Sequence, residues 1–150
     1  MEQHFFLTME KIPTVTAQQK GERIMGGKIV HFDKPAVKEA KATFTSLLSE
    51  HRPEQPYGRG VPLFLKISFY YPWKGRVKDP ATRFKTTKPD ADNAAKILID
   101  CMTRLGFWWD DCQIASYRID KIEVNTNYRG EDTTDTGIYI DIRPIIEDKT

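Results

Sequence analysis

Two groups of aspartates in the second half of the chain have residue types suited to metal chemistry. Asp90 and Asp92 directly precede an apolar, helix-forming stretch, and Asp110 and Asp111 follow it after a Trp-Trp pair. Mg²⁺ is a hard cation that prefers carboxylate oxygens and keeps several waters. Ions held in this way activate water and neutralise charge at a phosphodiester under attack. The aspartates therefore indicate phosphodiester hydrolysis as the chemistry to test.

The stretch between the two groups predicts an amphipathic helix over residues 90–105. Asp92, Lys96 and Asp100 are spaced i, i+4, i+8 and fall on one side of it. The apolar residues fall on the other side: Ala94, Ile97, Leu98, Cys101, Met102 and Leu105. A lysine beside an acidic cluster can orient water or stabilise developing negative charge.

Ordinary structural roles can also explain these aspartates and Lys96. The aspartates at the helix start are good N-caps, and Lys96 between two aspartates is typical of a salt-bridged surface. The Asp110-Asp111 pair also fits a solvated turn. The helix is about 24 Å long at 1.5 Å per residue, so Asp111 reaches Asp90 only if the chain folds back.

The remaining elements predict an α+β fold in a single domain, residues 1–150, with a mixed sheet and two main helices on one side. Strands are expected at 3–9 and 61–73, and a hairpin at 23–32 around Gly26-Gly27. A first helix runs to about Glu50, with Asp33 as N-cap and Pro35 in its first turn. Segments 113–126 and 136–145 are expected to form a final antiparallel pair.

Composition excludes several classes of protein. The chain has 150 residues, of which 39% are hydrophobic and 29% charged, which is ordinary for a globular domain. No run approaches a membrane span, and the start does not resemble a secretory signal. Only two cysteines occur, Cys101 and Cys112, which fits a cytoplasmic protein. No glycine-rich run forms a P-loop, so we expect no nucleotide cofactor.

Charge is divided unevenly along the chain. Residues 1–88 hold 16 Lys/Arg and 8 Asp/Glu, whereas residues 89–150 hold 7 and 13, so net charges of +8 and −6 make up the total of +2. Six basic residues crowd the predicted loop at 74–88: Lys74, Arg76, Lys78, Arg83, Lys85 and Lys88. Because carboxylates repel phosphates, an acidic site acting on DNA needs cations beside it. We therefore expect this loop to bind DNA.

Two motifs together resemble the RusA family of Holliday junction resolvases. The first is Asp90-Ala91-Asp92-Asn93-Ala94-Ala95-Lys96, with Asp100 further along the helix. The second is Gly106-Phe107-Trp108-Trp109-Asp110-Asp111-Cys112-Gln113. Their spacing matches the family without gaps, and the close match covers residues 89–119.

The resemblance implies a homodimeric, Mg²⁺-dependent endonuclease, with Mn²⁺ as a possible substitute, that nicks four-way DNA junctions symmetrically in recombination and repair. It implies that Asp90, Asp92 and Asp111 bind metal and that Lys96 is the catalytic lysine. Asp100 and Asp110 would be supporting acids. Members of the family are common in prophages.

Two alternatives remain open. In the first, the protein binds branched DNA or assists replication without catalysis, although its full carboxylate set argues against this. Pro89-Asp90 also allows a PD-(D/E)xK nuclease, whose second half would have to be Glu39-Ala40-Lys41 or Glu147-Asp148-Lys149.

Overall fold

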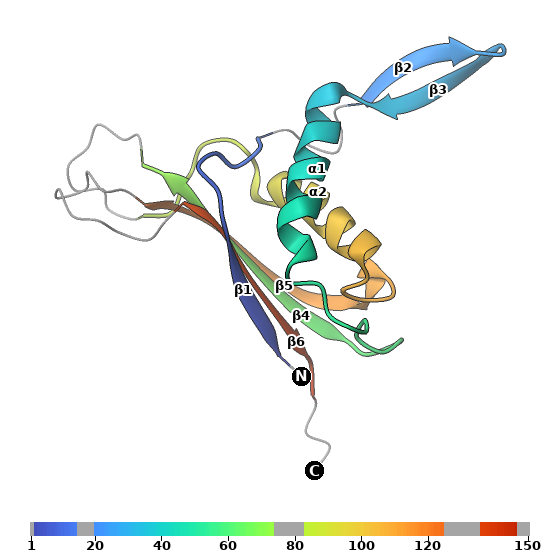
Figure 1. The fold of residues 1–150 in the computed structure, drawn as a ribbon. Helices are drawn as coiled ribbons and strands as arrows, with labels where there is room; N and C mark the ends of the chain where they lie inside the picture. Colours follow the sequence, from blue (N-terminus) through green and yellow to red (C-terminus); the bar gives the residue numbers. More distant parts are fainter. Residues whose placement is uncertain (1, 15–19, 74–82, 125–135, 147–150) are drawn as a thin grey trace.

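The computed structural model describes residues 2–14, 20–73, 83–124 and 136–146. A four-stranded mixed sheet carries the fold, with strand order β1-β6-β4-β5. Its strands are β1 (Gln3–Thr8), β4 (Leu63–Pro72), β5 (Ile114–Val124) and β6 (Gly137–Pro144). Two helices, α1 (Pro35–Ser49) and α2 (Ala91–Leu105), cover one face of this sheet (Figure 1). The predicted α+β fold with a mixed sheet is confirmed.

Strand β4 lies at the centre of the sheet. It pairs with β5 in parallel and with β6 in antiparallel orientation. Leu65, Ile67 and Phe69 are fully buried on one face. On the opposite face, Ser68 is 1% exposed and Lys66 is partly buried.

The predicted antiparallel pairing of the last two strands is wrong. β4 separates β5 from β6, so the two strands never meet in the described sheet. Alternating polarity identifies a strand with one buried face, but it does not identify the strand's neighbours. The crossover through α2 makes β5 parallel to β4 and leaves β5 as the outer strand.

Helix α2 ends as its sequence predicts. Gly106 adopts the left-handed conformation at φ 82°, and the Phe107 amide donates to the Met102 carbonyl at 3.1 Å. Glycine is favoured there because it has no Cβ to clash. The predicted apolar face is also confirmed, since Ile97, Leu98, Cys101 and Met102 are buried in the core. Phe44 and Leu48 of α1 join the same core.

The start of α1 differs slightly from expectation. Pro35 is in the first turn, as predicted, but the N-cap residue is Lys34 instead of Asp33, and no side chain caps the helix. Proline fits this position because the missing N–H would have no partner within the helix.

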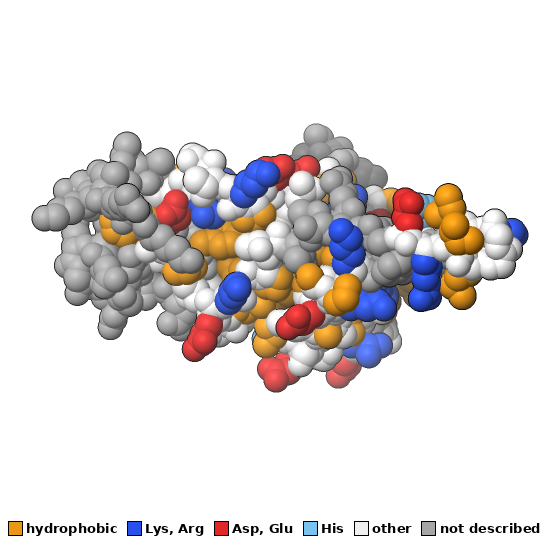
Figure 2. All heavy atoms as spheres, turned by 90° about the horizontal axis from the view of Figure 1, so that it is seen from above, with side chains coloured by type: hydrophobic (Ala, Val, Ile, Leu, Met, Phe, Trp, Pro, Cys, Tyr) orange, Lys and Arg blue, Asp and Glu red, His pale blue; other side chains and the backbone are white. Residues whose placement is uncertain are grey.

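A two-stranded hairpin projects away from the sheet (Figure 1). It comprises β2 (Lys20–Met25) and β3 (Lys28–Asp33), joined at Gly26-Gly27 as the sequence predicts. Ile24, Met25 and Ile29 are more than half exposed on it, and Figure 2 shows apolar side chains at this end of the molecule. No helix of the described residues is long and apolar enough to cross a membrane.

Candidate active site

The Asp90 carboxylate is not used to cap α2. Asp90 occupies the N-cap position with extended backbone, but its side chain makes no capping hydrogen bond. Its carbonyl accepts from the Ala94 amide at 2.9 Å, while its carboxylate accepts only a long 3.4 Å bond from Asn93 among the described residues. The side chain is exposed. Capping, the ordinary explanation for an aspartate here, therefore does not account for this carboxylate.

The side chains of Asp92 and Lys96 likewise lack bonding partners among the described residues. Both are exposed on the outer face of α2. In the described parts of the chain, neither takes part in a salt bridge or side-chain hydrogen bond, although they are four residues apart. The salt-bridged helix surface considered from the sequence is therefore not formed. The start of α2 presents two carboxylates and an amine to solvent.

Lys121 of β5 fixes the position of this helix start. Its ammonium donates to the Thr87 carbonyl at 2.8 Å and to the Pro89 carbonyl at 2.6 Å, directly before Asp90. Pro89 itself is buried and follows a cis peptide bond. No sequence pattern identifies Lys121, because its partners are backbone carbonyls more than thirty residues away. It is a positioning residue: it holds the backbone from which Asp90 projects.

Asp110 and Gln113 build the second half of the motif. The 3₁₀ turn η1 (Asp111–Gln113) is capped by Asp110, whose Oδ1 accepts from the Cys112 amide at 2.9 Å and from its thiol at 2.9 Å. Gln113 Oε1 accepts from the Trp109 and Asp110 amides. Gln113 Nε2 donates to the Gly58 carbonyl at 2.8 Å and so ties the turn to a distant loop. These two residues are structural and present Asp111 to solvent.

The pKa values of the neighbouring Asp110 and Asp111 are shifted in opposite directions. Hydrogen bonds from the Cys112 thiol and amide lower the pKa of Asp110. Partial desolvation, together with the proximity of Asp110 and Asp100, raises the pKa of Asp111. Ligand atoms of Asp110, Asp111 and Cys112 lie within 4.8 Å of one another. Because the Asp110 oxygen is already hydrogen-bonded and thiolate is a soft ligand, Asp111 is the better Mg²⁺ ligand of the three.

The structure does not bring Asp111 to Asp90 within one chain. Asp90 directly precedes the first residue of α2 and Asp111 follows its last, and fifteen helical residues span about 22 Å. The neighbour of Asp111 on the helix is Asp100, which acts on its pKa. The described residues therefore form two acidic groups. Asp90, Asp92 and Lys96 lie at one end of α2, and Asp100, Asp110 and Asp111 at the other.

The predicted basic loop is described only in part. Lys74, Arg76 and Lys78 lie outside the described residues. Lys88 is exposed directly before Pro89, and the Lys85 ammonium donates to Thr87 at 2.8 Å. Lys85 and Lys88 line a cavity with Lys11 and the buried Tyr71, next to the start of α2. Two of the predicted cations thus lie beside the Asp90 end of the helix.

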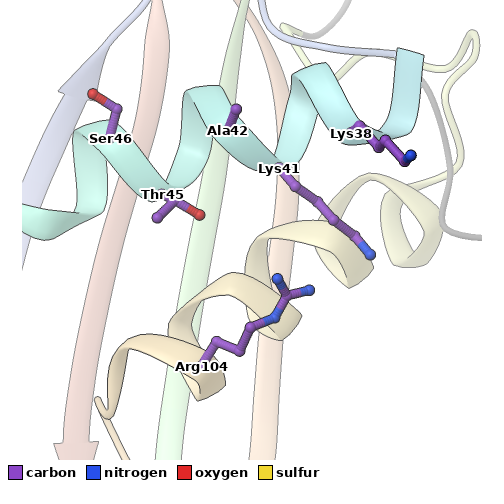
Figure 3. Close-up of a pocket in the computed structure, with 6 residues that line it drawn as sticks. All are labelled: Lys38, Lys41, Ala42, Thr45, Ser46 and Arg104. Carbon is purple, nitrogen blue, oxygen red and sulfur yellow. The ribbon is translucent and has the colours of Figure 1, made fainter. Parts of the chain in front are cut away.

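Three further cations, not predicted from the sequence, form a basic groove. Lys38, Lys41 and Arg104 line it together with Ala42, Thr45 and Ser46 (Figure 3). Lys41 from α1 and Arg104 from α2 extend toward one another. The i, i+3 spacing of the two lysines was the available signal, but Arg104 joins them only through helix packing. Lys41 thus lies toward the C-terminal end of α2, which gives no support to the PD-(D/E)xK alternative.

The two tryptophans of the motif have different roles. Trp108 is 1% exposed, and its indole N–H donates to the Thr103 hydroxyl at 2.8 Å, so it packs in the core. Trp109 is 53% exposed, with the Arg59 guanidinium 4.4 Å from its ring centroid. A turn this short has only one side facing the core.

Exposed carboxylates on a rigid helix, with lysines and arginines around them, are features of an enzyme that works on a phosphate polymer. The family model described as Endodeoxyribonuclease RusA matches residues 11–143. The crossover junction endodeoxyribonuclease of Lactococcus phage r1t is 32% identical over 127 residues, which are 85% of this chain and 93% of that protein. The Escherichia coli K12 and Enterobacteria phage 82 proteins of the same name are each 43% identical over 74 residues, about half of either chain. The chain belongs to the RusA family of endodeoxyribonucleases.

Proposed function

We propose that this protein resolves four-way DNA junctions as a Mg²⁺-dependent homodimeric endonuclease, making paired symmetric nicks in the cytoplasm during recombination and repair. The observation that carries the proposal is the start of α2. Asp90 and Asp92 are exposed carboxylates there, and neither caps the helix nor pairs with Lys96 in the described structure. Exposed carboxylates that make no capping bond or ion pair, held on a fixed backbone, are preorganised to bind a cation.

The donor set fits Mg²⁺. Asp90, Asp92 and Asp111 offer hard carboxylate oxygens, whereas the thiol of Cys112 is tied to Asp110. When bound, the ion would supply an activated water and neutralise charge on the phosphate. Mn²⁺, which takes the same ligands, would substitute.

Each residue near the metal has a distinct role in the proposal. Asp90 and Asp92 hold the ion, and Lys96, one turn along the same face, stabilises charge that develops on the phosphate. Lys121 keeps the backbone of Asp90 in place through Pro89. Asp100 supports the second acidic group at the far end of the helix.

DNA is held by cations around the acids. Lys85 and Lys88 flank the start of α2, and the groove of Lys38, Lys41 and Arg104 lies between the helices. Arg83 and the loop residues Lys74, Arg76 and Lys78 extend the proposed contact surface. Because phosphate contacts release counterions, binding is expected to weaken steeply with salt.

The test is cleavage of a synthetic four-way junction in Mg²⁺ by the wild type, Asp92→Asn and Glu39→Gln. Glu39 is an exposed acid on α1 and serves as the matched control. We expect the wild type and Glu39→Gln to make paired nicks at equal rates. Asp92→Asn should bind the junction but cut it at least about 100-fold more slowly, the loss expected when a stabilising charge is removed.

Two results would overturn the proposal. Equal cleavage by Asp92→Asn and the wild type would remove Asp92 from the site. Metal-independent junction binding without nicking, by the wild type, would favour the non-catalytic alternative.

A further inference from the structure

A cavity of about 740 Å³ opens beside the start of α2. Four parts of the chain line it: residues 10–14, the end of β4, Glu123 of β5 and residues 85–89. Its size falls within the range of pockets that hold small ligands. Because residue 89 directly precedes Asp90, the cavity adjoins the carboxylates to which the proposed function assigns the metal.

The walls of this cavity are held by contacts within the chain itself. The Lys121 ammonium donates to the Thr87 and Pro89 carbonyls, and the Lys121 carbonyl accepts from the Lys85 amide at 2.8 Å. In the 10–14 segment, Ile12 is 4% exposed and belongs to the hydrophobic core. The cavity is therefore preformed, so a ligand can bind without first ordering these walls.

Tyr71 is the residue of the wall whose polar group has no structural role. Its side chain is 6% exposed, and its hydroxyl has no hydrogen-bond partner among the described residues. Buried polar groups are nearly always paired, and an unpaired one destabilises the fold. Phenylalanine would fill the same space without that cost. The hydroxyl therefore indicates a ligand that bonds to it when the cavity is occupied.

The other groups of the cavity favour a nucleobase over a phosphate as the ligand. Tyr71 and Pro72 contribute ring surface, and the Lys85 ammonium lies 5.3 Å from the centroid of the Tyr71 ring. Glu10 and Glu123 also line the cavity, and their carboxylates would repel a phosphate. A base, in contrast, has flat faces for stacking and an edge that carries both donors and acceptors. Amines, carboxylates and ring surface together fit such a ligand.

We propose that this cavity binds one unpaired base of the DNA junction, beside the phosphate that is cut, and that the Tyr71 hydroxyl bonds to that base. The inference rests on the proposed function for the position of the cut phosphate at Asp90. Pro89 lines the cavity and its Cα lies about 3.8 Å from that of Asp90, so a nucleotide next to this phosphate is within reach. Extruding a base costs least where stacking is already interrupted, as at the point of strand exchange.

Binding to junctions that lack single bases tests the inference without cleavage. Non-cleavable four-way junctions carry an abasic site in both like strands, at each position around the point of strand exchange in turn. Fluorescence anisotropy in Mg²⁺ gives their affinities for the wild type, for Tyr71→Phe, which keeps the ring, and for Tyr70→Phe. Tyr70 is the matched control because it neighbours Tyr71 on β4 but faces the other side of the sheet, where its ring centroid lies 5.9 Å from that of Phe6.

The expected result is a coupling between one base and one hydroxyl. An abasic site at one position should weaken binding by the wild type at least about fivefold, because the stacking and hydrogen bonds of that base are lost. Tyr71→Phe should bind the intact junction about fivefold more weakly than the wild type, the usual effect of one hydrogen bond. On the junction that lacks the sensitive base, the two proteins should bind equally. Tyr70→Phe should match the wild type on every junction.

Three results would overturn the base pocket. The first is a loss of affinity in Tyr71→Phe that is equal on intact and abasic junctions, which would indicate contact with the DNA backbone. The others are unchanged binding by Tyr71→Phe and a wild type that is insensitive to every abasic site. Nicking of a cleavable junction by the wild type is measured in parallel. A wild type that shows the coupling but does not nick would refute the proposed function and leave the base contact in place.

Discussion

Lys121 offers the sharpest test of how the fold positions the site. Its ammonium makes two hydrogen bonds, to the Thr87 and Pro89 carbonyls, and connects β5 to the start of α2. Replacement by methionine keeps the unbranched apolar stem of the side chain but removes its terminal ammonium, which donates both bonds. Each charge-assisted bond contributes about 1.5 kcal/mol or more when buried. Because Lys121 is half-buried and water can replace part of the loss, we expect about 2 kcal/mol of destabilisation in total.

Urea denaturation measures this loss, and Lys66→Met is the matched control. Lys66 is also half-buried in the sheet, on β4, and its ammonium has no hydrogen bond or ion pair among the described residues. Junction nicking by Lys121→Met should fall at least about tenfold with little change in junction binding, because Asp90 shifts while the DNA contacts remain. Equal stability of the Lys121→Met variant and the wild type, with equal nicking, would refute the positioning role.

Three further substitutions have expected outcomes. Tyr71→Phe removes a buried hydroxyl without a partner, so the free energy of unfolding in urea should rise by about 1 kcal/mol. Burial also raises the pKa of Tyr71 to about 12, so the wild type should lose stability as pH rises from 10 to 12, at about 1.4 kcal/mol per pH unit. The Tyr71→Phe variant should lack this loss. Gln113→Leu should cost about 2 kcal/mol in the same assay, because four hydrogen bonds of the turn are lost. Replacing both Lys41 and Arg104 by alanine should weaken junction binding in fluorescence anisotropy and reduce its logarithmic salt dependence by about 2, whereas an unchanged slope would exclude the groove from the interface.

Local patterns were sufficient to predict α2. Its apolar face follows from helical spacing, and its end follows from Gly106, which needs only its own backbone conformation. The hairpin at Gly26-Gly27 is local in the same sense. These features depend on residues within a few positions of one another, so the sequence displays them directly.

Long-range relations were not predictable in this way. The sequence shows two strands at its end, but not that β4 lies between them. It shows Asp90 and Asp111 in two motifs of fixed spacing, but not that the helix between them keeps them apart in a single chain. Lys121 bonds to carbonyls, which every residue possesses, so no side-chain pattern identifies its partners. The groove cations are likewise assembled by the packing of α1 on α2.

Mn²⁺ binding, followed by electron paramagnetic resonance, tests most directly whether the start of α2 holds a metal. The wild type, Asp92→Asn and Glu39→Gln are titrated with the cation in the presence of a non-cleavable junction. We expect the wild type and Glu39→Gln to bind Mn²⁺ equally and Asp92→Asn to lose at least about tenfold in affinity. Undiminished Mn²⁺ binding by a folded Asp92→Asn variant would show that Asp92 does not hold the metal.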